Sequence, residues 1–385
     1  MASNNAIYLD NNATTKIDPI VLESMMPFLT NNYGNASSNH DLGLISSKAV
    51  KDSRHHLSKL IGCEEHEIFF TSGATEAINL SLKSIIDNCG KPNPHIITSL
   101  TEHPAVLDTC KFLESKGVRV TYLPVSNEGL IDINDFEKAF DGSTVLACIM
   151  LVNNETGVIQ PINSLTKIAH KHNVIFMSDG TQAVGKIPIN VYDSEIDILC
   201  FSGHKFYAPK GIGALFLRSK RPFKPRLSPQ QHGGGHEKGL RSGTLNVPGI
   251  VGIGKAAELS VLQLQKESSR IKNLRDELEV NLLKLSGTQI NGSIKFRISN
   301  TTSICFDGAD ADAIMVGLKS IAVSNGSACS SESIEPSHVL KAMGKSDSQA
   351  FSTIRFSLGR FTTESEIKET IKIVTRVVLQ LRELV

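Results

Sequence analysis

The chain lacks an excess of charge of either sign, because 40 lysines and arginines stand against 39 aspartates and glutamates, a formal net charge of +1. It therefore has no overall basic field that would attract nucleic acid or an anionic membrane surface. It also lacks any run of about 18 apolar residues, the length that a membrane-spanning helix needs. These absences argue against direct binding of nucleic acid and against a membrane protein.

A disulfide framework and a secretory signal are lacking as well. The seven cysteines are odd in number, include no C-x-x-C pair and lie mostly in apolar surroundings. The first residues, Met1–Asn5, contain neither a charged region nor an apolar one. We therefore expect a cytoplasmic protein.

Strand-like and helical segments alternate along most of the chain. The strand-like runs are Ile68–Thr71, His95–Ser99, Val118–Leu123, Thr144–Val152, Val174–Ser178, Ile196–Phe201 and Gly213–Leu217. Their near-continuous apolar character is typical of buried strands in a largely parallel sheet. A long helical region from about Val251 to Leu285 precedes a mixed α+β segment, and a last helix runs from about Glu364 to Leu384. The pattern predicts an α/β protein of two domains, with the boundary near the long helix.

One strand-like run ends abruptly in Ser202-Gly203-His204-Lys205. In open parallel sheets, ligands bind at the carboxyl ends of the strands. The amine of Lys205 can there form a Schiff base with an aldehyde such as pyridoxal phosphate, and Ser202 and His204 can donate to a phosphate. A solvated surface lysine is the alternative interpretation.

A second strand end has the features of an anion site. The run Ile68–Thr71 gives way through Ser72 and Gly73 to a helical pattern. Free backbone N–H groups at a helix start suit a phosphate, Gly73 permits close approach, and Thr75 adds a hydroxyl. A plain capped helix after a strand would have the same pattern.

Polar residues also end three other strands. They are Thr101-Glu102-His103, Asn153-Asn154-Glu155 and Asp179-Gly180-Thr181-Gln182. Asp179 beside a pyridine nitrogen would keep that ring protonated, and His103 is flat enough to stack on the ring and basic enough to move protons. Asn154 and Gln182 can hydrogen-bond the phenolic oxygen of the ring. Each of them alone is also compatible with a cap or a turn, but strand ends that converge predict one site.

Loops elsewhere supply further candidates. Cys329 lies among the small polar residues of Ser324–Pro336 and is a candidate nucleophile, although a loop cysteine often has no such role. Arg355 follows a strand pattern and is a natural bidentate partner of a carboxylate, with a surface ion pair as the alternative. Asn35, in a polar loop, could line a site or form a turn. The glycines of residues 232–244 favour backbone contact with a phosphate or a partner subunit over a zinc site.

Taken together, these stretches resemble the cysteine desulfurases of the class V aminotransferase type, in particular the group that includes NifS and IscS. The most specific motifs are Thr71–Glu76, Ser202–Lys205, Arg241–Thr244 and Gly326–Ser330, and the resemblance extends from Leu9–Thr15 to Arg355–Ser357. It implies the type I pyridoxal-phosphate fold. In that fold a large cofactor-binding domain, residues 15–255, has a mostly parallel seven-stranded sheet. A smaller α+β domain, residues 1–14 and 256–385, carries the catalytic cysteine loop.

The resemblance also implies how a cofactor, pyridoxal 5'-phosphate, would be held. Lys205 would form the Schiff base, Asp179 would pair with the ring nitrogen, and His103 would stack on the ring and transfer protons. Contacts with the ring oxygen and the phosphate would come from Gln182, Asn154, Ala74, Thr75, Ser202, His204 and, in a homodimer, Thr244 of the partner subunit. No metal is implied.

The implied substrate is L-cysteine. Arg355 would bind its carboxylate, with Asn35 and Asn154 nearby. Cys329 would take the sulfur as a persulfide and release L-alanine. A protein acceptor would then receive the sulfur for iron-sulfur cluster assembly, tRNA thiolation or DNA phosphorothioation.

The chain departs from the family pattern in three places. Pro104 replaces a usual basic residue, and Gly180-Thr181 stands where two alanines are common. The sequence stops at Val385 without the tail that housekeeping members use to dock the iron-sulfur scaffold, so we expect weak docking there and a more specialised acceptor, possibly in DNA phosphorothioation. Two alternatives remain open: another pyridoxal-phosphate aminotransferase or lyase, which would not need Cys329, and a non-enzymatic sulfur carrier, which would need only that thiol.

Overall fold

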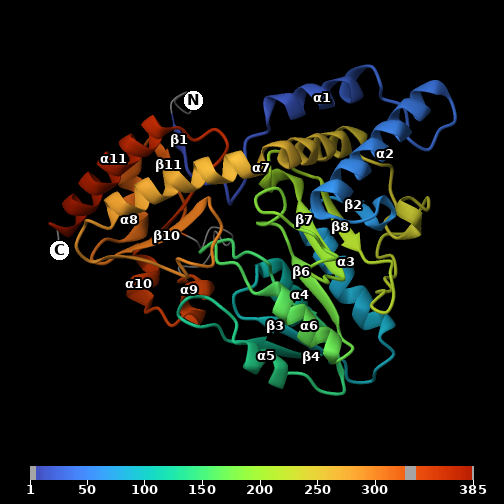
Figure 1. Ribbon diagram of the computed structural model, residues 1–385, viewed down its shortest axis with the longest axis horizontal. Coiled ribbons are helices and arrows are strands. Elements are labelled where there is room, and N and C mark those ends of the chain that lie inside the picture. Colours follow the sequence, from blue (N-terminus) through green and yellow to red (C-terminus); the bar gives the residue numbers. More distant parts are fainter. Residues whose placement is uncertain (1–5, 326–334, 384–385) are drawn as a thin grey trace.

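A seven-stranded sheet forms the centre of the computed structural model, which describes residues 6–325 and 335–383 (Figure 1). Its strand order is β2-β8-β7-β6-β5-β3-β4. The strands are β2 (Ile68–Thr71), β3 (His95–Ser99), β4 (Arg119–Leu123), β5 (Thr144–Cys148), β6 (Ile175–Asp179), β7 (Ile198–Ser202) and β8 (Gly213–Leu217). Only β8 runs against its neighbours. The predicted mostly parallel seven-stranded sheet is thus confirmed.

Both faces of this sheet are covered, which explains why its strands are apolar throughout. Successive residues of β7 alternate between two buried clusters: Leu199 and Phe201 belong to one, and Ile198 and Cys200 to the other. The helices of this part are α1 (Pro19–Thr30), α2 (Asp41–Ile61), α3 (Ala74–Asn88), α4 (Pro104–Glu114), α5 (Ile133–Lys138) and α6 (Ile162–Lys171). Helices α3 and α4 contribute to the second cluster, while α1, α2 and α6 contribute to the first.

A separate hydrophobic core brings both ends of the chain together (Figure 1). It contains an antiparallel sheet of order β12-β10-β9 and a parallel pair, β1 with β11. The elements are β1 (Ile7–Tyr8), β9 (Thr288–Ile290), β10 (Thr301–Phe306), α8 (Ala311–Leu318), β11 (Ile321–Ala322), β12 (Thr353–Ser357) and α11 (Glu364–Arg382). Two short helices, α9 (His338–Ala342) and α10 (Asp347–Phe351), form a small cluster of their own. Leu9, from the start of the chain, packs in the same cluster as Val374 of the last helix.

Helix α7 (Val247–Leu282) runs from the large sheet to this second core and contributes buried residues to both (Figure 1). An 18-residue window of it is apolar enough to cross a membrane, but 56% of that window is buried inside the fold. Burial of this kind is what a core helix of a folded domain requires. The apolar character of α7 is therefore explained by packing.

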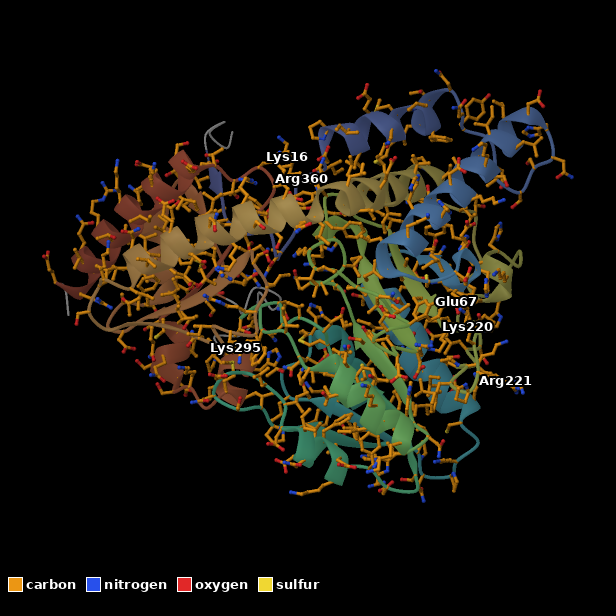
Figure 2. The ribbon with its side chains drawn as sticks, viewed as in Figure 1. Lys16, Glu67, Lys220, Arg221, Lys295 and Arg360 are labelled. Carbon is orange, nitrogen blue, oxygen red and sulfur yellow. The ribbon has the colours of Figure 1, made fainter. Side chains whose placement is uncertain are left out.

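Arg360, labelled in Figure 2, connects the second core to the N-terminal segment and to α7. Its Nη1 lies 2.7 Å from Asp18 Oδ2, and its Nε lies 2.8 Å from Glu267 Oε1. Lys16, also labelled in Figure 2, stacks over the ring of Phe361 at 5.6 Å. The N-terminal segment, α7 and the segment after β12 are thereby fixed relative to one another.

One strand is shorter than the sequence predicts. The run Thr144–Val152 was expected to be a single strand, but β5 ends at Cys148. Beyond it, the side-chain oxygen of Asn153 accepts from the backbone N–H groups of Glu155 and Thr156 and so forms a turn. The backbone N–H groups of Ile149 and Leu151 still donate to Met177 and Asp179 of β6, so the apolar run stays beside the sheet until this turn.

Candidate active site

A cavity of about 370 Å³ opens where the carboxyl ends of the central strands meet the second core. Its wall contains Asn12, Ala13, Ala74, Thr75, Ile78, His103, Ala105, Met150, Val152, Asn154, Asp179, Thr181, Gln182, Ser202, His204, Lys205 and Arg355. All predicted site residues except Asn35, Thr244 and Cys329 therefore lie around one space. The prediction that the strand ends converge agrees with this geometry.

Lys205 lies in a single 3₁₀ turn, Gly203–Lys205, directly after β7. Its Nζ donates to the backbone oxygens of Asn12 at 2.6 Å and Ala13 at 2.7 Å. The turn itself is held because the backbone oxygen of His204 accepts from both the N–H and the hydroxyl of Thr15. The segment 12–15, near the start of the chain, thus positions the amine of Lys205 at the end of β7.

The start of α3 forms the anion-binding part of the cavity. No side chain caps this helix, and the N–H of Ala74 donates to Ser202 Oγ at 2.7 Å. A Cβ atom at Gly73 would lie 3.3 Å from that hydroxyl, so glycine keeps the approach to the helix start open. Free N–H groups, the Ser202 hydroxyl and Thr75 are the donor set that a phosphate binds.

His204 borders this region as an uncharged group. Burial, together with the positive charge of Lys205, lowers the pKa of His204 to about 4. Its Nδ1 lies 3.1 Å from Thr14 Oγ1. At neutral pH this imidazole therefore contributes hydrogen bonds and no charge.

Asp179 and His103 face the cavity from neighbouring strand ends. Asp179 is the last residue of β6, is buried, and accepts the N–H of Thr181 at 2.9 Å. His103 caps α4, and its Nδ1 accepts the N–H of Ala105 at 3.1 Å. Burial lowers the pKa of His103, against the opposing effect of Asp179. The hydrogen bond assigns the proton of the neutral ring to Nε2, so His103 is a hydrogen-bond donor at Nε2 in this state.

Arg355, on β12, supplies the cation of the second core. It is only 4% exposed, its Nη2 lies 2.7 Å from Asp10 Oδ1, and its Nη1 donates to the backbone oxygen of Asn154 at 3.1 Å. Its Nε is buried without a hydrogen-bond partner among the described residues. A buried guanidinium with an unused donor is suited to a ligand carboxylate.

Asn12 is a wall residue that the sequence pattern did not single out. It is 2% exposed, and its backbone oxygen accepts from Lys205 Nζ and from Gln182 Nε2 at 2.9 Å. The loop around it, rich in Asn and Thr, has the composition of an ordinary turn. The sequence did contain a signal that could have predicted Asn12 as a site residue. Its polar loop follows a short strand, as the polar residues at the other strand ends do.

Three predicted residues are not among those around the cavity. Asn35 is exposed, and its Oδ1 accepts the N–H of Ser37 at 2.9 Å, which is turn chemistry; the structure does not bring it to the cavity of its own chain. Thr244 is exposed, so its predicted contact with the cofactor of a partner subunit stays a prediction. Cys329 lies outside the described residues. Within 6–325 and 335–383, no group of three histidine, cysteine or acidic side chains could hold a metal.

The cavity residues fit pyridoxal phosphate. The uncapped start of α3 suits its phosphate, Lys205 its aldehyde and Asp179 its ring nitrogen. Two buried polar atoms of the wall, Thr181 Oγ1 and Arg355 Nε, have no partner among the described residues, as expected of a wall that a polar ligand completes.

Comparison with known proteins identifies the relatives. The class-V aminotransferase family profile matches residues 7–370. The cysteine desulfurase IscS of Mannheimia succiniciproducens is 48% identical over 381 residues, 98% of this chain and 94% of that protein. The structure of a NifS-like protein is 38% identical with a TM-score of 0.90, covering 98% of this chain and 99% of that one. The structure of SspA in complex with cysteine is also 38% identical, with a TM-score of 0.83 and coverage of 93% and 100%.

Proposed function

The chain belongs to the class-V aminotransferase family and, within it, to the pyridoxal-phosphate-dependent cysteine desulfurases, and from this premise we propose how it handles sulfur. It converts L-cysteine to L-alanine and leaves the sulfur on Cys329 as a persulfide. The observation that carries this proposal is that Lys205 and Arg355 lie in the wall of one cavity. An amine that exchanges with an amino group and a guanidinium that binds a carboxylate together recognise an α-amino acid.

The side chains divide the work of this reaction. When bound, pyridoxal phosphate supplies an electron-withdrawing ring that stabilises negative charge at the substrate Cα. Arg355 binds the carboxylate, and Asp179 holds a proton at the ring nitrogen. Since His103 presents Nε2–H in its neutral form, the amine of Lys205 is the base that takes the α-proton, and His103 donates a hydrogen bond.

Sulfur transfer requires a thiolate. Cys329 attacks the substrate sulfur, an S–S bond forms as the Cβ–S bond breaks, and the electron pair left on Cβ takes up a proton. The products are alanine and a persulfide on the chain. Incubation of the purified protein with pyridoxal phosphate, L-cysteine and a thiol reductant should release sulfide and alanine in equal amounts. Release of a keto acid in place of alanine would support an aminotransferase, and neither product would support a sulfur carrier.

We expect Asp179→Asn to lower the rate of sulfide release about 10²-fold or more while the cofactor stays partly bound. The amide cannot hold the ring nitrogen in its protonated form, so the α-proton is less acidic. The measurement is sulfide release under saturating cofactor, with cofactor content read from visible absorbance. The exposed Asp108→Asn is the matched control and should keep the full rate. A near-normal rate for Asp179→Asn would assign ring protonation to another residue.

A homodimer is the assembly we propose. Exposed apolar side chains gather on α1, the loop after it and the start of α2: Leu22, Met26, Leu29, Tyr33 and Leu44. Such a surface is suited to a second copy of the chain. Thr244, which is exposed, would reach the cofactor of the partner in this dimer. The six described cysteines are all free thiols, which supports a cytoplasmic location.

The acceptor of the sulfur is proposed to be a protein, because a net charge of +1 gives this chain no overall basic field that would attract a nucleic acid. Iron-sulfur cluster assembly, tRNA thiolation and DNA phosphorothioation are its three candidate pathways. Loading the protein with radiolabelled cysteine and adding a cell extract would show which proteins become labelled. Label in RNA or DNA without a labelled intermediate protein would contradict the proposal.

A further inference from the structure

Asn12 lies between the two cations of the cavity, and we propose that it is the positioning residue that fixes their spacing. Its backbone oxygen accepts from Lys205 Nζ at 2.6 Å. Its side-chain Nδ2 donates to the backbone oxygen of Asn154 at 3.1 Å, and Arg355 Nη1 donates to that same oxygen, also at 3.1 Å. Asn12 is thus hydrogen-bonded to one cation and shares an acceptor with the other.

The side chain of Asn12 has no freedom to rotate, because all of its polar atoms are engaged. Its Nδ2 also donates to Thr301 Oγ1 at 2.9 Å. Its Oδ1 accepts from Asn300 Nδ2 at 3.1 Å and from Lys186 Nζ at 3.4 Å. The backbone N–H donates to Ser357 Oγ at 2.9 Å. A buried polar network with every member satisfied is rigid, whereas one with a member missing is not.

The network reaches both sides of the cavity. On the side of the second core, Ser357 lies two residues after Arg355 in β12, so the two side chains project from the same face of the strand. On the side of the large sheet, Gln182 Nε2 donates to the backbone oxygen of Asn12 at 2.9 Å, and Lys186 Nζ donates to Gln182 Oε1 at 2.6 Å. Asn12 therefore joins the strand that carries the guanidinium to the residues around the amine.

This spacing matters for recognition of an α-amino acid, a point that rests on the proposed function. The amino group and the carboxylate of such a substrate are attached to a single carbon. The amino group must reach the place where Lys205 holds the cofactor while the carboxylate reaches Arg355, so the separation of Lys205 and Arg355 must be fixed, since small misplacements lose binding and rate. Asn12 should therefore contribute to recognition of the α-carboxylate without touching it.

The test compares two ligands on the cofactor-loaded enzyme. L-alanine carries an α-carboxylate and ethylamine does not, and neither contains sulfur, so binding is read from the change in visible absorbance without turnover. The wild type should prefer L-alanine because Arg355 binds its carboxylate. In Asn12→Ala we expect that preference to fall about tenfold, the effect expected when a displaced Arg355 loses one hydrogen bond to the charged carboxylate. The affinity for ethylamine should change much less.

Asn11→Ala is the matched control. Asn11 is also buried and donates from Nδ2 to the backbone oxygen of Ser357 at 2.9 Å, but it does not line the cavity. It should lower the melting temperature to a similar degree and leave the ligand preference unchanged.

Asn12→Asp is a second variant that creates no void. It keeps an acceptor for Asn300 but sets an oxygen against the backbone oxygen of Asn154, so it should lose the preference as well. A preference within twofold of wild type in both Asn12 variants, or an equal loss in Asn11→Ala, would overturn the inference. Failure of the proposed function has a different signature, because a wild type that binds L-alanine preferentially but releases no sulfide would contradict only the desulfurase reaction.

Discussion

Turnover and the visible absorbance of the bound cofactor are both expected to vanish in Lys205→Ala. Lys205 is the only lysine in the described wall of the cavity, and its Nζ is held by the backbone oxygens of Asn12 and Ala13. Lys186 cannot replace it, because this amine is not in the cavity wall and donates to Gln182 Oε1. The loss of rate should be on the order of 10⁴-fold or more, as for the removal of other groups that act covalently.

The measurement combines sulfide release with absorbance after removal of free cofactor by gel filtration. Lys210→Ala is a suitable control, because Lys210 is exposed and lies five positions further along the same loop. It should keep both the colour and the rate. Turnover by gel-filtered Lys205→Ala protein would refute the assignment of Lys205 as the residue that holds the cofactor.

The sequence predicts which residues lie around the cavity where those residues follow the end of a strand. Lys205, Asp179 and His103 each lie at or a few residues beyond the end of an apolar run, and the carboxyl ends of parallel strands meet at one edge of a sheet. Since the alternation of strands and helices already indicated a parallel sheet, the meeting of these residues followed from topology. The same reasoning placed Thr75 at the start of a helix beside Ser202, where the structure has it.

The predictions fail where contacts join distant parts of the chain. The ion pair between Asp10 and Arg355 spans 345 positions, and Asn12 donates its N–H to Ser357 across the same separation. Periodicity in the sequence cannot predict such a contact, because the contact forms only when the second core brings both chain ends together. Asn35 differs from these residues, because its Oδ1 satisfies the backbone of its own loop, and its predicted place near the substrate stays a prediction.

The described cysteines are poor candidates for the sulfur-accepting thiol. Burial raises the pKa of five of them: Cys63, Cys110, Cys148, Cys200 and Cys305. The pKa reaches about 12 for Cys110 and about 11 for Cys305. A thiol must ionise to act as a nucleophile, so these side chains remain inert near neutral pH. The sixth, Cys89, is partly buried and donates to the backbone oxygen of Ile86 at 3.1 Å.

The residues on either side of the range 326–334, which contains Cys329, also support its assignment as the sulfur-accepting thiol. Before it, the backbone of Ser324 is paired with that of Arg355, which lines the cavity. After it, His338 Nε2 donates to the backbone oxygen of Glu102 at 3.0 Å, next to His103 in the chain. The chain therefore enters and leaves the stretch that contains Cys329 beside two residues of the cavity wall.

We accordingly expect Cys329→Ser to bind L-cysteine, seen as a change in visible absorbance, but to release sulfide at least about 10³-fold more slowly than wild type. Binding survives because Lys205 and Arg355 are unchanged, whereas a serine hydroxyl cannot accept sulfur as a persulfide. Cys89→Ser is the control and should keep the wild-type rate. Trypsin digestion and mass spectrometry after cysteine treatment of the wild type should find the additional sulfur atom on the peptide with Cys329. Sulfur on the peptide with Cys89 or Cys305 would instead identify a different acceptor thiol.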